Sequence, residues 1–141
     1  MLWPDFFDEC RRHGNLVLPP HGILFAFAQT GYADQPGPGL YPGLSLFRVF
    51  KEALTNAVKH SGCTEVTVLA EFSPTWFRLR VRDNGRGMAA AEAVGRGLRN
   101  MAARIQEMGG TMTRRSRGGT VLVFEAPLPL TLAAGLPEVP A

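Results

Sequence analysis

The stretch that decides the fold is EALTNAVKH, residues 52–60. On a helix, at about 100° per residue, its apolar side chains fall on one face. The opposite face carries Glu52, Asn56, Lys59 and His60. An amide oxygen is a hard ligand for Mg²⁺, and cations neutralise phosphate charge, so this face suits a metal ion and a chain of phosphates. An ordinary amphipathic helix with a solvated polar face has the same pattern, and the stretch alone leaves both interpretations open.

The composition indicates one globular domain. The chain has 141 residues, of which 45% are hydrophobic and 19% charged, enough for a core. No apolar run approaches the roughly 20 residues of a membrane span, and the N-terminus lacks the layout of a signal peptide. Cys10 and Cys63 are isolated and have no partners at zinc spacing. We therefore expect reduced thiols, a cytoplasmic location and no direct membrane contact.

The basic charge raises the question of nucleic-acid binding. The net charge is +3 and the pI is near 9.3. Arg78, Arg80 and Arg82 alternate along one predicted strand, so they share a face of the sheet, which we expect to be solvated. No aromatic residues at stacking spacing accompany them, and no DNA-binding motif is present. Nucleic acid is therefore not an expected partner, and the charge remains an electrostatic hint.

The first third of the chain predicts a short helix and a strand. Residues 4–13 carry apolar side chains at helical spacing, and Gly14 is a suitable stop. His13 is interpreted as a surface histidine. Residues 21–29 are nearly all apolar and precede a loop rich in glycine and proline, which predicts a buried strand.

The central helix follows this loop, residues 31–43. We expect the helix to start near Gly43 or Leu44. Ser61-Gly62 is a good stop signal.

An aspartate ends the second strand of the hairpin predicted next, which joins residues 65–72 to residues 76–83. Asp83 keeps the parity of Phe77, Leu79 and Val81, so it should point to the core side. A carboxylate there is costly unless donors surround it. The local backbone could donate, as in an ordinary turn aspartate, or a ligand amine could, such as the exocyclic amino group of adenine.

Two glycine pairs flank the segment after Asp83. Gly85 and Gly87 permit positive φ and a close approach of a ligand to the backbone. Gly95 and Gly97 open a helix at Leu98, where backbone N–H groups and the helix dipole can hold a phosphate. Each pair alone is a weak signal, and the order matches neither the Walker pattern nor the dinucleotide fingerprint.

A second hairpin joins residues 111–117 to residues 120–126 across Gly118-Gly119. Thr120 shares parity with the apolar residues of its strand, so its hydroxyl should face inward on the same sheet as Asp83. A buried threonine commonly bonds its own backbone, which is the ordinary alternative.

With these motifs in order, residues 44–129 resemble the catalytic, ATP-binding domain of sensor histidine kinases, closest to nitrate-sensor and DesK-type kinases with a short ATP lid. The wider superfamily includes DNA gyrase, heat-shock chaperone ATPases and MutL. The resemblance implies an α+β, two-layer sandwich (the Bergerat fold), with a mixed, mostly antiparallel sheet of about five strands packed on about three helices. Residues 1–129 would form the ATP-binding domain and residues 130–141 a flexible tail.

The resemblance also implies roles for individual residues. Asn56 would bind the Mg²⁺ that bridges the phosphates, and Glu52 would be the acid that activates or orients the transfer. Asp83 would accept a hydrogen bond from the adenine amino group, and Thr120 would close the adenine side. The remaining predicted nucleotide-binding residues are Lys59, His60, Gly85, Gly87, Met88, Gly95, Gly97 and Leu98.

The implied partners are ATP, the helical dimerisation and phosphoacceptor domain of the same kinase, and a response regulator. The phosphoacceptor hairpin would precede residue 1, so the chain would be part of a larger sensor. We expect the chain alone to be a monomer that binds ATP and shows little autophosphorylation. The alternative is a module of the same superfamily, either an anti-sigma-factor-type serine kinase or a non-catalytic ATP binder.

Overall fold

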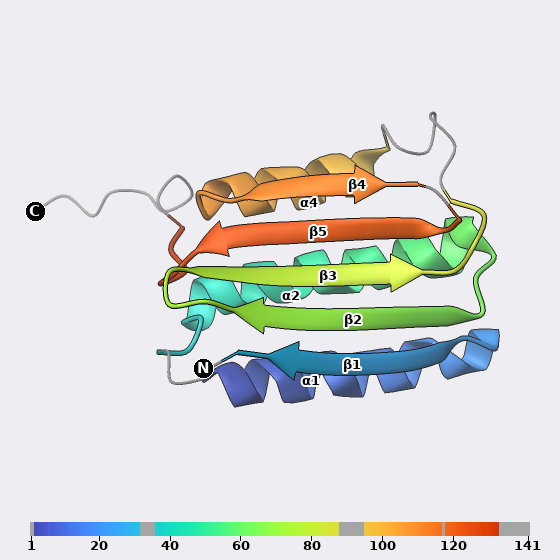
Figure 1. Ribbon diagram of the computed structural model, residues 1–141, viewed down its shortest axis with the longest axis horizontal. Helices are drawn as coiled ribbons and strands as arrows, with labels where there is room; N and C mark the ends of the chain where they lie inside the picture. Colours follow the sequence, from blue (N-terminus) through green and yellow to red (C-terminus); the bar gives the residue numbers. More distant parts are fainter. Residues whose placement is uncertain (1, 32–35, 88–94, 117, 133–141) are drawn as a thin grey trace, which may run out of the picture.

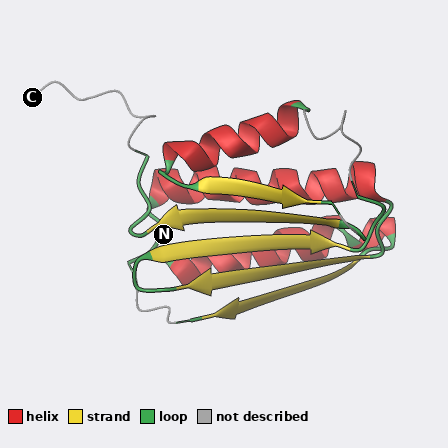
Figure 2. Ribbon diagram, turned by 45° about the horizontal axis from the view of Figure 1, so that its top comes forward, coloured by secondary structure: helices red, strands yellow, loops and turns green. Residues whose placement is uncertain are grey.

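The computed structural model describes residues 2–31, 36–87, 95–116 and 118–132, which form two layers. Three α-helices lie on one face of a five-stranded sheet (Figure 1, Figure 2). This confirms the predicted α+β sandwich. The helices are α1 (Trp3–Val17), α2 (Leu40–Asn56) and α4 (Arg96–Glu107), and the strands are β1 (Leu24–Thr30), β2 (Glu65–Phe72), β3 (Trp76–Asp83), β4 (Thr111–Arg115) and β5 (Thr120–Pro127).

The strand order in the sheet is β1-β2-β3-β5-β4. β1 pairs with β2 in parallel, and the other three pairs are antiparallel. Because successive side chains alternate between faces, the inward residues of β3 and β5 lie against α2 and α4. β3 and β5 are therefore the strands that can present side chains to a site beneath the helices.

Helix α1 is longer than the sequence predicted. It continues through Gly14 to Val17, so Gly14 is not its stop. Gly14 is buried, and a Cβ there would collide with the ring of Phe25 on β1. The missing side chain therefore lets α1 pack closely on the strand, a contact that local sequence signals do not reveal.

Strand β1 is not the buried strand that the sequence predicted. It lies at the edge of the sheet, and its exposed residues alternate with half-buried Phe25 and Phe27. A run of apolar residues is typical of strands that are buried on both faces. Here α1 covers one face of β1, and the other face stays open.

Helix α2 begins at Leu40, three residues before the predicted start, because Pro42 falls in its first turn, where proline is tolerated. At its other end the chain passes into a π-helical turn, Ala57–Ser61. Gly62 then stops the helix with φ of 62°, as predicted. The wider turn inserts an extra residue and changes the direction in which Ser61 points.

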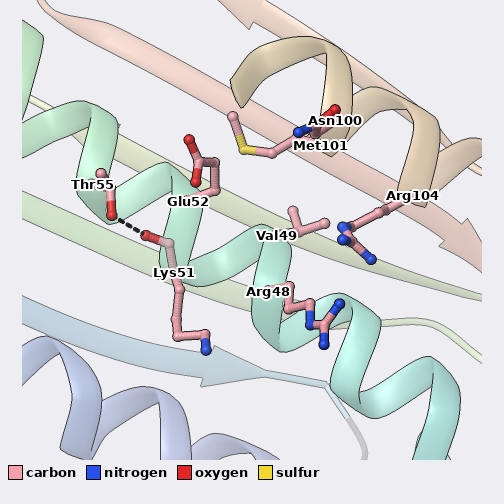
Figure 3. A pocket seen from close by; sticks show the side chains of 8 residues that line it. All are labelled: Arg48, Val49, Lys51, Glu52, Thr55, Asn100, Met101 and Arg104. Carbon is pink, nitrogen blue, oxygen red and sulfur yellow. Dashed lines mark hydrogen bonds between the residues drawn. The ribbon is translucent and has the colours of Figure 1, made fainter. Parts of the chain in front are cut away.

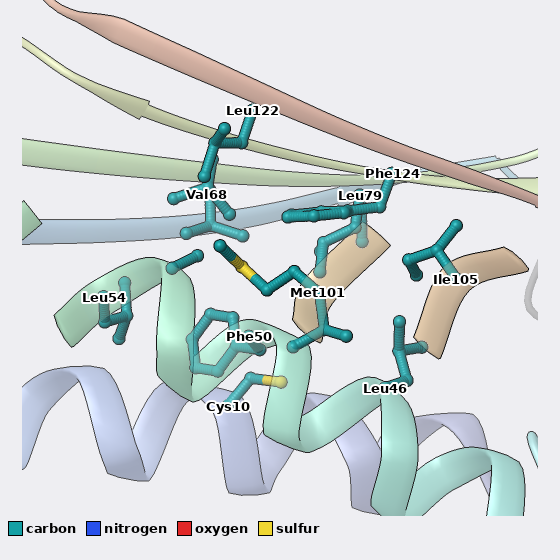
Figure 4. Close-up of a cluster of buried hydrophobic side chains, with 14 of the residues drawn as sticks. Cys10, Leu46, Phe50, Leu54, Val68, Leu79, Met101, Ile105, Leu122 and Phe124 are labelled. Atoms are coloured by element: carbon teal, nitrogen blue, oxygen red, sulfur yellow. The ribbon is translucent and has the colours of Figure 1, made fainter. Parts of the chain in front are cut away.

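The core fills the space between the sheet and the helices (Figure 4). Trp3 of α1 anchors one end, with ring centroids 4.9 Å from Phe72 and 4.8 Å from Phe77. Such aromatic contacts tie the first helix to β2 and β3. Cys10 and Cys63 are both free and buried, and burial raises the pKa of the Cys10 thiol.

The open face of the sheet carries the arginines that the sequence placed together. Arg78 lies between two glutamates, with its Nε 3.3 Å from Glu125 Oε2 and its Nη1 3.9 Å from Glu71 Oε1. Arg80 Nη2 is 3.7 Å from the same Glu71 oxygen. Within the described residues, no helix is long and apolar enough to cross a membrane.

Candidate functional site

A small cavity lies where α2 faces the ends of β3 and β5. Its volume is about 10 Å³, which is room for about one water molecule. Helix α2 and its π-helical turn supply three small side chains and one amide to this cavity, and the two strands supply two polar and two apolar side chains. The lining residues are Ala53, Asn56, Ala57, Ser61, Val81, Asp83, Thr120 and Leu122. Three of the predicted site residues, from segments far apart in the sequence, therefore meet here.

Asp83 points inward, as its parity predicted, and is 7% exposed. The backbone N–H groups of Gly85 and Thr120 donate to its Oδ1 at 2.9 and 3.3 Å. Burial is the main effect on the carboxyl group and raises its pKa, while these two hydrogen bonds and the Ser61 hydroxyl oppose the rise. Backbone N–H groups therefore meet part of the hydrogen-bonding capacity of this carboxylate, as in a turn aspartate. Burial still disfavours its charged form.

Two polar atoms in the same cavity have no hydrogen-bond partner. They are the Nδ2 of Asn56 and the Oγ1 of Thr120, and Thr120 is only 3% exposed. A buried polar group without a partner typically costs about 1–3 kcal/mol. Five buried side-chain atoms in the described part of the chain share this condition. That two of them line one cavity beside Asp83 indicates that the cavity is built to receive a polar ligand.

Gly85 is required for a close approach and not for its backbone angle. Its φ is not positive, which corrects the prediction, but a Cβ there would collide with the carbonyl oxygen of Ser61. That same carbonyl accepts the N–H of Arg86 at 2.8 Å. Gly87 does have a positive φ, of 80°. The turn after β3 is thus packed directly on the end of the π-helical turn.

Glu52 lies outside this cavity. It lines a groove of about 270 Å³ between α2 and α4, together with Arg48, Lys51 and Arg104 (Figure 3). Its carboxylate lies against Gly97, where a Cβ would collide with Oε1. Gly97 is in the first turn of α4, and a negative charge at a helix N-terminus is favourable. The predicted catalytic residue, Glu52, therefore lies in contact with Gly97 of the second glycine pair.

The other predicted residues have different surroundings. Lys59 is exposed and His60 half-buried, both in the π-helical turn just beyond Asn56. Gly95 is the N-cap of α4. Leu98 is buried in the core, so its side chain is not available to a ligand. Met88 lies outside the described residues.

Comparison with known proteins identifies the family of the chain. The family model for histidine kinase-, DNA gyrase B- and HSP90-like ATPases matches residues 42–130, more than half of the chain. The chain belongs to this ATPase family. The match contains Glu52, Asn56, Asp83 and Thr120.

One relative is a histidine-protein kinase/phosphatase. Over 94 residues the chain is 37% identical to the signal transduction histidine-protein kinase/phosphatase DegS of Bacillus subtilis, covering 62% of this chain and 24% of DegS. The chain therefore spans about a quarter of the length of that relative.

Solved structures share the fold of this ATPase-family chain. One is the histidine kinase AdeS of Acinetobacter baumannii, with a TM-score of 0.73 and 15% identity, covering 92% of this chain and 67% of that one. Another is full-length ShkA in complex with AMPPNP, with a TM-score of 0.67 and 24% identity, covering 88% of this chain and 30% of that one. At these identities the likeness concerns the fold.

Sequence reasoning missed two groups of site residues in this ATPase-family chain. Ala53 on α2 and Ala57 and Ser61 on the π-helical turn form one wall of the cavity, and the signal was small side chains at every fourth position. Asn84 holds the end of β3, because its Oδ1 accepts the N–H groups of Thr64 and Glu65, both at 2.9 Å. Its place beside a glycine turn carries no local signal for this role.

Proposed function

We propose that this chain is the ATP-binding catalytic domain of a sensor histidine kinase. The domain would donate the γ-phosphate of ATP to a histidine on a separate dimerisation and phosphoacceptor domain. Family membership and the 37% identity to DegS support the class. The observation that carries the proposal is the single cavity lined by Asp83, Thr120 and Asn56.

The adenine ring is proposed to bind at this cavity. Asp83 would accept a hydrogen bond from the exocyclic amino group, and both of its backbone hydrogen bonds use Oδ1, so Oδ2 is the natural acceptor. The Thr120 hydroxyl would bond a ring nitrogen and thereby gain a partner. A cavity of about 10 Å³ is far smaller than a purine, so its lining must separate when the nucleotide enters.

The triphosphate is proposed to run from the cavity toward the N-terminus of α4. There the backbone N–H groups near Gly95 and Gly97 would face the phosphates. Lys59 and His60 would approach the phosphates from the π-helical turn.

The amide of Asn56 fits a magnesium ion, because its side chain lines the cavity and an amide oxygen is a hard ligand for Mg²⁺. No cluster of three or more His, Cys, Asp or Glu that could hold a metal is found among the described residues, and one amide ligand suffices for a magnesium ion held mainly by phosphates and water. Magnesium would supply charge neutralisation on the phosphates.

The proposed reaction breaks the bond between the γ-phosphorus and the bridging oxygen of ADP and forms a bond to an imidazole nitrogen. ADP leaves, and the imidazole loses a proton. Glu52, whose carboxylate on α2 lies against the N-terminus of α4, would orient the accepting imidazole or take that proton. The phosphate would then pass to a response regulator.

Asp83→Asn tests the adenine assignment. Guanine carries an oxygen where adenine carries its amino group, so an amide at residue 83 can donate where the carboxylate can only accept. We expect the variant to lose about tenfold or more in ATP affinity while its preference for ATP over GTP collapses. Calorimetry with both nucleotides measures this. Unchanged ATP affinity in a folded variant contradicts the assignment.

A further inference from the structure

The groove between α2 and α4 carries three cations without a carboxylate partner in the described part of the chain. Arg48, Lys51 and Arg104 line it. Among the residues that the structure describes, none of the three belongs to an ion pair. Lys51 instead lies over the ring of Phe47, 5.0 Å from its centroid. Arg11 and Arg12 on α1, by contrast, have acidic partners in Asp8 and Glu9.

The one acid in the groove is turned away from the arginines. Glu52 directs its carboxylate to Gly97, while the guanidinium groups of Arg48 and Arg104 lie together at the other end (Figure 3). Two like charges that face one space repel each other. A carboxylate placed between them would remove this repulsion and could accept hydrogen bonds from both.

The groove leads directly to the proposed reaction centre. Helices α2 and α4 run in opposite directions (Figure 1), so Arg48 lies near Arg104 and Glu52 near Gly97. Arg48 is one helical turn before Glu52, which is about 6 Å along the axis. A segment held by the two arginines would therefore pass beside Glu52.

The same helix face continues as an apolar surface. Leu44 is 46% exposed, and Leu40 is exposed one turn earlier. Leu40, Leu44, Arg48 and Glu52 are spaced by four residues, so they form one stripe along α2. Apolar contacts at one end and cations in the middle suit an amphipathic helix with an acidic face.

We propose that the groove between α2 and α4 docks an acidic helical segment of the protein that accepts the phosphate, with Arg48 and Arg104 binding its carboxylates. The inference rests on the proposed function, because that function requires an acceptor beside Glu52. An acidic residue of the segment would sit on the arginine pair about one helical turn from the accepting side chain.

A nucleic acid fits the groove less well than an acidic helix does. No aromatic ring for base stacking is among the described residues that line it. The carboxylate of Glu52, which also lines the groove, would repel a phosphate backbone.

The test uses this chain and a synthetic helical peptide of about 18 residues, with glutamate and leucine on one face at four-residue spacing. NMR titration should shift the amides of residues 48, 51 and 104. Arg48→Glu/Arg104→Glu should weaken peptide binding about tenfold or more. The matched pair Arg82→Glu/Arg115→Glu, on the open sheet face, should change it less than about twofold.

ATP affinity, measured in parallel, separates the two proposals. If the unmodified chain does not bind ATP, the proposed function fails. If it binds ATP but both charge-reversal pairs bind the peptide equally, or the shifts map to the open sheet face, the docking inference alone fails. Stronger binding of a single-stranded DNA 12-mer than of the peptide to the groove also overturns it. Retained ATP affinity with selective loss of peptide binding supports it.

Discussion

Asp83 and Thr120 are register partners on the adjacent strands β3 and β5, and the Thr120 N–H donates to Asp83 Oδ1 at 3.3 Å. The pairing of two central strands therefore fixes the position of this carboxylate. A group held by a sheet keeps its geometry better than one held by a loop. The candidate adenine contact, Asp83, is thus part of the rigid sheet, whereas the turn after β3 can change conformation more easily.

Asp83→Asn should raise the stability of the chain at neutral pH. Burial raises the pKa of Asp83 above its ordinary value of 3.8, so the folded chain holds this proton more tightly than the unfolded chain does. Stability is therefore lost as pH rises from about 3.8 through the raised pKa. Asparagine avoids this loss, so its advantage in urea unfolding should be largest at pH 7 and shrink toward pH 4. A variant less stable at pH 7 would contradict the prediction.

Thr120→Val should separate stability from ligand binding. The threonine hydroxyl is buried without a partner, so replacing it should leave the unfolding free energy unchanged or raise it by about 1 kcal/mol. ATP affinity should fall about fivefold, because the ligand loses one hydrogen bond. The control is Thr113→Val, on the open face of the sheet, which should change neither quantity. Equal ATP affinity of the two variants would remove the role of Thr120.

Asn56→Ala should weaken nucleotide binding only when magnesium is present. We expect about a tenfold loss of ATP affinity with magnesium, and a much smaller difference in the presence of a chelator. Asn100→Ala is the matched control, because Asn100 is an exposed asparagine on α4. A loss of the same size with and without magnesium would assign Asn56 to the nucleotide and not to the metal.

Gly85→Ala should destabilise the fold more than Gly62→Ala. A methyl group at residue 85 meets the carbonyl of Ser61, and backbone must shift to admit it, which typically costs about 1–3 kcal/mol. At residue 62 the methyl group meets open space, and the cost is the positive φ alone, about 1 kcal/mol. Urea unfolding compares the two. Equal losses would show that the contact with Ser61 is easily relaxed.

His13 should make stability depend on pH near neutrality. Burial, and then the charge of Lys51, lower its pKa, and its ring packs 5.8 Å from that of Phe47. The unfolded chain thus binds this proton more readily, so stability decreases as pH falls through about 6.5. His13→Gln should make the unfolding free energy nearly independent of pH between about pH 7.5 and about pH 5.5. Arg12→Gln, at the neighbouring exposed position, should retain the slope.

Local periodicity predicted the parts of the site that depend on one strand or one helix. The alternation along β3 and β5 placed Asp83 and Thr120 inward, and the helical pattern placed Asn56 on the polar face of α2. These predictions required only that the buried face of each strand or helix be identified from its sequence. The confirmed α+β architecture was implied by the family resemblance of residues 44–129.

What the sequence did not predict depends on neighbours that are distant in the chain. The edge position of β1 follows from strand order, which its apolar sequence does not encode. Gly14 and Gly85 have their roles because Phe25 and Ser61 lie against them. The separation of Glu52 from the cavity likewise follows from its contact with Gly97 on another helix.

The π-helical turn Ala57–Ser61 sets the direction in which the chain leaves α2. Each residue of this wider turn rotates less than the roughly 100° of a regular α-helix, so the same residues in a regular helix would place Ser61 out of phase. The Ser61 carbonyl would then leave the N–H of Arg86, and the cavity would lose this part of its wall. Substitutions that convert this turn into regular α-helix should therefore be rare among descendants that keep the pocket.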